Sequence, residues 1–178
     1  MRTGRKDKEN IAHKLMEKLK SAGVEGKLAL YTLHGRSKDA RYARLADWEY
    51  IHRTLFYWPP TYADMRSCAR LADPVPFFGC GDVLSWHDYY RNLEGEGSAI
   101  AGEMIGRGAL IKPWIFTEIK ERRDWDISAA ERLDILRQFA RCGLEHWGSD
   151  QTGVERTRRF LLEWLSFLHR WVVEWEWA

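Results

Sequence analysis

Three short stretches of this sequence combine glycine with side chains that are able to bind an anionic ligand. One is Gly106-Arg107-Gly108, which follows the apolar run 99–105 and precedes a second apolar run whose Pro113 suits the first turn of a helix. A strand, a glycine turn and a helix start together expose backbone N–H groups, and an arginine beside them adds a bidentate charge. The pattern predicts a phosphate site with Gly106 and Arg107 as contacts. The alternative is an ordinary turn that carries a surface arginine.

Two more stretches of this kind follow candidate strands earlier in the chain. His34-Gly35-Arg36 follows the strand candidate 28–33, and Gly79-Cys80-Gly81-Asp82 follows the strand candidate 75–78. In parallel sheets whose strands alternate with helices, the residues just after each strand meet at one edge. The three stretches therefore predict a site for a phosphorylated ligand at that edge.

Each polar residue in these stretches also has an ordinary structural interpretation. His34 is either a ligand contact or a capping or core histidine, and Asp82 is either a ligand contact or a turn residue. We interpret Cys80 as a small filler of a tight turn in preference to a reactive thiol. The remaining histidines show no metal-ligand spacing, and we assign no catalytic residue and no metal ligand.

The elements that would position these loops alternate along the chain. Helical periodicity covers about 8–22, 47–55, 85–93 and 114–120, between the strand candidates 28–33, 75–78 and 99–105. After Ser128, whose capping box with Glu131 starts a long helix, the pattern is helical only, and a second long helix begins near Gly153. Alternating strands and helices predict an α/β fold with a parallel sheet, and the final two helices predict an antiparallel pair.

Composition limits the classes of protein that fit. The chain has 178 residues, 45% of them hydrophobic, and no run is long and apolar enough to cross a bilayer. Its three cysteines lack disulfide or metal spacing, which favours a reducing compartment, the cytoplasm or the nucleus. Net charge is +2, but residues 1–60 carry 13 Lys/Arg against 7 Asp/Glu. This excess suits a polyanionic partner or, alternatively, a solvated face.

The loop sequences resemble those of the flavin-dependent tRNA-dihydrouridine synthases. The resemblance rests on the stretches 32–37 (TLHGRS), 78–82 (FGCGD) and 106–114 (GRGALIKPW). The helical part resembles the eukaryotic class of that family, through the stretches 125–128, 131–137, 143–150 and 158–167. The similarity covers most of residues 1–170, with a gap at 56–75.

Membership of that family would imply a TIM (β/α)8 barrel that binds FMN at the C-terminal edge of its strands, followed by an α-helical tRNA-binding domain. Residues 1–122 would then be the second half of the barrel, and residues 123–178 a truncated helical domain. The implied reaction is NADPH-driven reduction of the C5–C6 double bond of a uridine in tRNA, with hydride passing from reduced flavin to C6 and a cysteine protonating C5. By motif match, the residues that contact FMN would be His34, Cys80, Gly81, Asp82, Gly106 and Arg107.

The sequence also departs from the pattern of that family. Cys80 stands where the family has asparagine, and no residue here matches its catalytic cysteine. A complete barrel takes about 250 residues, so we expect a fragment, and the resemblance does not imply that this length of chain is active alone. The oligomeric state is open. The alternative function is a non-enzymatic RNA-binding or interaction fragment, based on the basic first third and on Arg156, Arg159 and Arg170.

Overall fold

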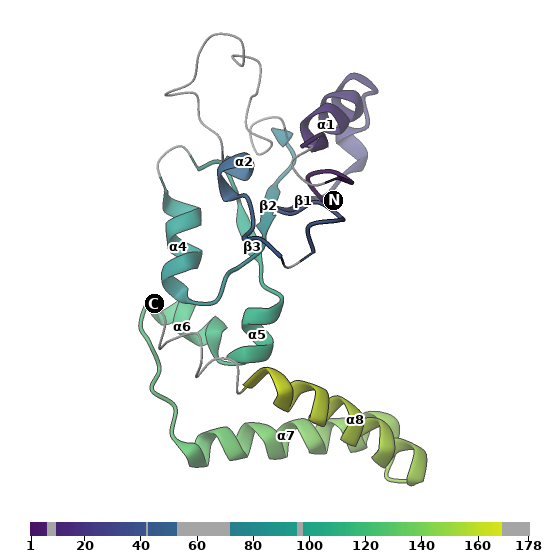
Figure 1. Ribbon diagram of the computed structural model, residues 1–178, viewed down its shortest axis with the longest axis vertical. Helices are drawn as coiled ribbons and strands as arrows, with labels where there is room; N and C mark the ends of the chain where they lie inside the picture. The colour runs from purple at the N-terminus through teal and green to yellow at the C-terminus, as the bar shows by residue number, and fades with distance from the viewer. Residues whose placement is uncertain (7–9, 42, 53–71, 96–97, 169–178) are drawn as a thin grey trace. The chain divides into compact units, whose positions relative to one another are not determined.

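The computed structural model describes residues 1–6, 10–41, 43–52, 72–95 and 98–168. Most of the unassigned segment 56–74 and the tryptophan-rich end 171–178 lie outside these ranges. The elements of the described part alternate between helix and strand and end in helices only (Figure 1). In chain order they are α1 (Ala12–Ser21), the 3-10 helix η1 (Glu25–Lys27), β1 (Tyr31–His34), α2 (Trp48–His52), β2 (Phe77–Cys80), α4 (Trp86–Glu94), β3 (Gly102–Met104), α5 (Arg107–Ile111), α6 (Ile115–Glu121), α7 (Ala129–Trp147) and α8 (Gln151–Leu168).

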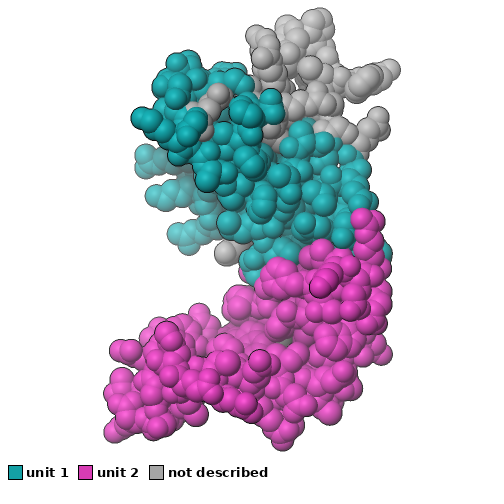
Figure 2. Space-filling view, turned by 180° about the vertical axis from the view of Figure 1, so that it is seen from behind, with its two compact units in different colours: residues 1–106 teal, residues 107–178 magenta. Residues whose placement is uncertain are grey.

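The chain divides into two compact units, residues 1–106 and residues 107–178 (Figure 2). The first, unit 1, holds the sheet, and the second, unit 2, holds α5 to α8. The predicted domain division between residues 122 and 123 falls inside unit 2 and stays a prediction. Each unit is described by itself below.

Unit 1 contains the expected parallel sheet, with strand order β1-β2-β3. Arg2 forms an isolated parallel bridge with His34, so the start of the chain lies along the outer edge of β1. The predicted strands 28–33, 75–78 and 99–105 overlap the observed ones, but each observed strand starts two or three residues later. In β2 the reason is Pro76, which has no N–H to donate; its carbonyl accepts a hydrogen bond from the Tyr31 N–H at 2.9 Å.

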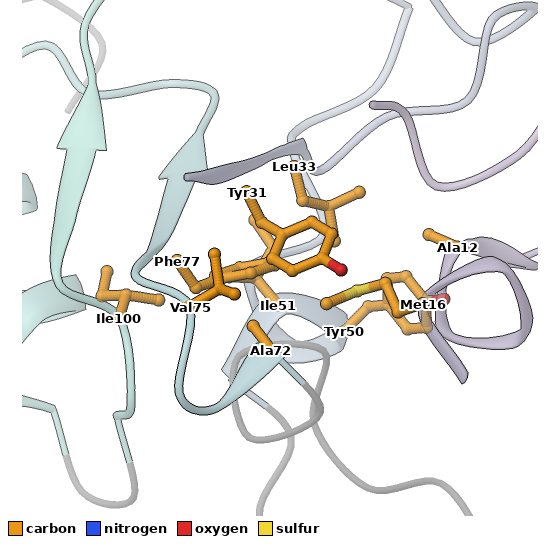
Figure 3. Close-up of a cluster of buried hydrophobic side chains, with 10 residues drawn as sticks. All are labelled: Ala12, Met16, Tyr31, Leu33, Tyr50, Ile51, Ala72, Val75, Phe77 and Ile100. Carbon is orange, nitrogen blue, oxygen red and sulfur yellow. The ribbon is translucent and has the colours of Figure 1, made fainter. Parts of the chain in front are cut away.

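One face of this sheet carries the hydrophobic core of unit 1. Because side chains alternate along a strand, Tyr31, Leu33 and Phe77 point to the same face, where α1 and α2 cover them (Figure 3). Leu33 from β1 and Ile51 from α2 are fully buried. The core therefore fixes α1 and α2 against β1 and β2.

Helix α4 packs against β3 and gives one carboxyl group an unusual environment. Ser85 caps the helix through a capping box with Asp88. Glu103 lies in the middle of β3, half-buried. Burial raises the pKa of Glu103 to about 8, and the charge of Asp88 acts in the same direction. The folded state therefore favours the protonated form of Glu103 at neutral pH.

Unit 2 consists of helices, and one of them differs from the prediction. The helix predicted over 114–120 is present as α6, which begins at Ile115, with Pro113 just before it. The short helix α5 was not predicted; it begins at Arg107 and has Gly108 inside it. Proline lacks the N–H that would continue α5 and disfavours helical geometry in the residue before it, so the helix ends before Pro113. Gly108 is thus a helical residue and not part of the turn.

The long helices α7 and α8 form the expected antiparallel pair. The capping box of Ser128 and Glu131 starts α7 as predicted, and α8 starts two residues before Gly153. A Cβ added to Gly143 would lie 2.6 Å from the Thr157 side chain, so the two backbones approach closely there. Between α5, α7 and α8 lies an apolar cavity of about 700 Å³.

Within the described ranges, no helix is long and apolar enough to cross a membrane.

The raised pKa of Glu103 predicts how stability changes with pH. The unfolded carboxyl ionises near pH 4.5 and the folded one near pH 8. The stability associated with the neutral group is therefore fully present below pH 4.5 and is lost as pH rises to 8. Glu103→Gln removes this titration, so we expect the variant to exceed the wild type in free energy of unfolding at pH 8 by about 2 kcal/mol, after allowance for solvent screening.

Urea unfolding at several pH values between 5 and 8.5 measures this difference. The control is Glu145→Gln, an exposed carboxyl on α7, which should follow the wild-type profile. If the free energies of unfolding of Glu103→Gln and the wild type differ by the same amount at every pH, the prediction is contradicted.

Candidate functional site

The C-terminal ends of the three strands lie level with one another. His34 at the end of β1 pairs with Cys80 at the end of β2, and Cys80 pairs with Met104 at the end of β3. Residues paired in register share a face of the sheet, and this face is opposite to the one that bears Leu33. The loops that follow the strands therefore start from one edge, as the sequence predicts for the stretches after 28–33 and 75–78. Gly106 follows the third strand on the same edge.

Arg36 and Asp82 connect the first two loops. The Arg36 side chain is 4% exposed, and its Nη2 donates to both Asp82 carboxylate oxygens at 2.6 and 2.5 Å. Its Nε donates to the Arg44 carbonyl at 2.5 Å, and the Ala46 N–H donates to Asp82 Oδ2 at 2.6 Å. Asp82 adopts a left-handed backbone with φ of 48°. The sequence left Asp82 open between a ligand contact and a turn residue. In the structure its carboxylate binds Arg36 and the Ala46 N–H, and its ligand role stays a prediction.

The glycines of these loops differ in what surrounds them. A Cβ on Gly35 would lie 2.9 Å from the Asp47 backbone nitrogen, and a Cβ on Gly81 would lie 2.5 Å from the Ala46 Cβ. Gly81 also has a φ of 134°, and its carbonyl accepts a hydrogen bond from the Trp48 indole at 2.9 Å. These glycines therefore allow close packing within the protein. At Gly106, by contrast, nothing lies within 4 Å of the Cβ position, so its backbone faces open space.

Of the three residues paired at the strand ends, His34, Cys80 and Met104, the first two have side chains that could face a ligand. His34 is half-buried, and its Cε1 lies 3.6 Å from the position of a Cβ on Gly81. Burial raises the pKa of the Cys80 thiol, although the positive charges of the N-terminal amino group, Arg2 and Arg36 act in the opposite direction. A thiol with a raised pKa stays neutral near pH 7 and is a poor nucleophile. This supports the interpretation of Cys80 as a filler.

Arg107 follows Gly106 directly and is the first residue of α5. It belongs to unit 2, where Lys112, just after α5, forms a buried ion pair of 2.6 Å with Glu118 of α6. Neither this ion pair nor the pairing of Arg36 with Asp82 was predicted from the sequence. Lys112 and Glu118 are six residues apart and lie in different elements, so helical spacing gave no signal. For Arg36 a signal was present, because an arginine and an aspartate follow neighbouring parallel strands.

The Arg36–Asp82 pair predicts a large effect of a single substitution. Arg36→Met leaves the Asp82 carboxylate without its main partner, and we expect a loss of about 3 kcal/mol in the free energy of unfolding. The matched control is Arg137→Met, which breaks an exposed pair with Asp134 on α7 and should change stability by less than about 1 kcal/mol. Chemical denaturation followed by circular dichroism compares the two, and equal effects would show that the pair does not hold the loops.

Comparison with known proteins identifies the family. The family described as "Dihydrouridine synthase (Dus)" matches residues 1–167. The chain is 55% identical over 172 residues to a rat protein and 54% identical to a human protein, both named "tRNA-dihydrouridine(47) synthase [NAD(P)(+)]-like". A protein of the fungus Coprinopsis cinerea, named "tRNA-dihydrouridine(47) synthase [NAD(P)(+)]", is 51% identical over 176 residues.

These alignments cover 97% of this chain and 24%, 23% and 24% of the rat, human and fungal proteins. The chain thus spans about a quarter of the length of the curated relatives that it matches. The family match covers the parallel sheet, the loops that follow its strands, and all but the last residue of α8. The chain therefore belongs to the dihydrouridine synthase family.

Proposed function

We propose that this protein is an FMN-dependent tRNA-dihydrouridine synthase, which reduces the C5–C6 double bond of a uridine in tRNA with NADPH. The names of the relatives support the substrate and the nicotinamide reductant. The observation that carries the proposal is the open backbone at Gly106, directly after β3, on the edge where His34 and Cys80 lie level. Because the chain spans about a quarter of its relatives, we assign to it a part of the site.

The proposed fold is the second half of a (β/α)8 barrel, followed by a helical domain that binds tRNA. Support comes from the parallel order β1-β2-β3, from helices α1 and α2 on one face, and from the Arg2 bridge that continues the sheet beyond β1. In such barrels the ligand binds at the C-terminal edge of the strands. The opposite face, which carries His34 and Cys80, would then be the interior of the barrel.

The residues of this edge fit FMN. Gly106 leaves room where a side chain would otherwise obstruct a phosphate, and Arg107 beside it supplies positive charge. We assign His34 to contact with the flavin and Cys80 to a neutral contact on the same face. Gly81 and Asp82 complete the proposed set, with Asp82 held in orientation by Arg36. When bound, FMN supplies the hydride chemistry that these side chains lack.

The role of Arg107 is testable through the phosphate. Arg107→Met removes a charge-assisted contact, and we expect FMN to bind about tenfold more weakly, while riboflavin, which has no phosphate, binds as to the wild type. Quenching of flavin fluorescence measures both affinities. Arg123→Met is the control, since Arg123 is 61% exposed and paired with Glu121. Failure of the wild-type chain to bind FMN would overturn the cofactor assignment.

A second candidate function is RNA binding without catalysis. Arg156, Arg158 and Arg159 are exposed on α8, and such a group suits a phosphate backbone. If this function holds, tRNA binds the wild-type chain without added FMN, its affinity falls steeply with salt, and Arg156→Gln/Arg159→Gln weakens it. Gel-shift titration at several salt concentrations tests this, and absence of binding at low salt would exclude it.

A further inference from the structure

The indole of Trp164 on α8 reaches the backbone of α5. Its Nε1 donates a hydrogen bond to the Leu110 carbonyl at 2.8 Å. The Trp164 residue is 7% exposed, and its ring packs against Phe139 of α7 with a centroid distance of 4.8 Å. Both partners of the hydrogen bond lie in unit 2. A side chain of the long helical pair therefore contacts the short helix that carries Arg107.

Helix α5 depends on contacts of this kind because it is only five residues long. A helix this short is not stable by itself, and its last carbonyls have no partner within the helix. The Lys112 N–H donates to the Gly108 carbonyl at 2.8 Å, and the Trp164 indole satisfies the carbonyl of Leu110. Trp164 thus acts as a C-terminal cap that is supplied by another helix.

The segment after α5 is fixed independently. Lys112 and Glu118 are 4% and 1% exposed and form an ion pair of 2.6 Å. The Glu118 Oε1 also accepts hydrogen bonds from the Trp114 indole and from the Trp125 N–H, both at 3.1 Å. The end of α5 is therefore held from α6 by a charge pair and from α8 by a neutral hydrogen bond. Of the two, the bond from Trp164 acts on the helix itself.

We propose that Trp164 is a positioning residue, which orients α5 and thereby places Arg107 for the phosphate of the cofactor. This inference rests on the proposed function. Because α5 has few bonds of its own, loss of the Trp164 cap lets the helix fray and lets the Arg107 side chain sample orientations that miss the phosphate. The helical pair then determines the affinity for the cofactor without touching it.

A pair of matched variants tests the proposal. Trp164→Phe removes the indole N–H and keeps an aromatic ring against Phe139. Trp147→Phe is the control, because the Trp147 ring lines the same cavity and stacks on Phe160 at 5.0 Å, while the donor to Leu110 stays in place. We expect Trp164→Phe to weaken FMN binding about tenfold and to leave riboflavin binding unchanged, and Trp147→Phe to change neither.

Two further measurements separate positioning from a general loss of stability. In the Arg107→Met background, Trp164→Phe should have no additional effect on FMN affinity, because its effect passes through Arg107. Hydrogen exchange of the cofactor-free protein should show faster exchange at the amides of α5 in Trp164→Phe, but not in Trp147→Phe.

The outcomes distinguish this inference from the proposed function. Absence of FMN binding by the wild-type chain would overturn the proposed function, and the inference with it. If the wild type binds FMN but Trp164→Phe binds it equally well, or loses FMN and riboflavin equally, the inference alone fails. Unchanged exchange of the α5 amides in Trp164→Phe would overturn it without any reference to the cofactor.

Discussion

The register of the parallel strands is the constraint on which the rest of unit 1 depends. Because His34, Cys80 and Met104 pair across neighbouring strands, the loops after β1, β2 and β3 start at the same level. A slip of one residue would move each side chain to the opposite face. Leu33 would then leave the core, and His34 would point toward the covering helices. The burial of Leu33, Phe77 and Ile51 thus fixes the same register that places His34 and Cys80 on the opposite face.

Glycine and charge have two different uses at this edge. Gly35 and Gly81 allow the segment around Ala46 to approach, and the Arg36–Asp82 pair then holds that segment against the strand ends. Gly106 has no such neighbour and leaves its backbone accessible. A glycine-rich loop therefore does not by itself indicate a ligand. What separates the two uses is whether another part of the chain already occupies the space that a side chain would take.

The sequence was sufficient to predict the elements that have local signals. The capping box at Ser128 marks a helix start correctly, and the alternation of strands and helices predicts the parallel sheet. Helix α6 matches the helix predicted over 114–120, but α5 was not predicted, because five residues that include Gly108 are too few to show helical periodicity. The Arg36–Asp82 and Lys112–Glu118 pairs join separate elements, so no local pattern reveals them.

Helix α5 connects the two kinds of structure in this chain. It follows Gly106 without a linker, so the last residue of unit 1 and the first residue of α5 share a peptide bond. Five residues cannot form a stable helix alone, and the stabilising contacts come from α6 and α8, through Lys112–Glu118 and Trp164–Leu110. The helix that follows Gly106 is therefore held by helices that lie further along the chain. Truncation before α8 would remove the donor to the Leu110 carbonyl and leave the end of α5 to the Lys112–Glu118 pair.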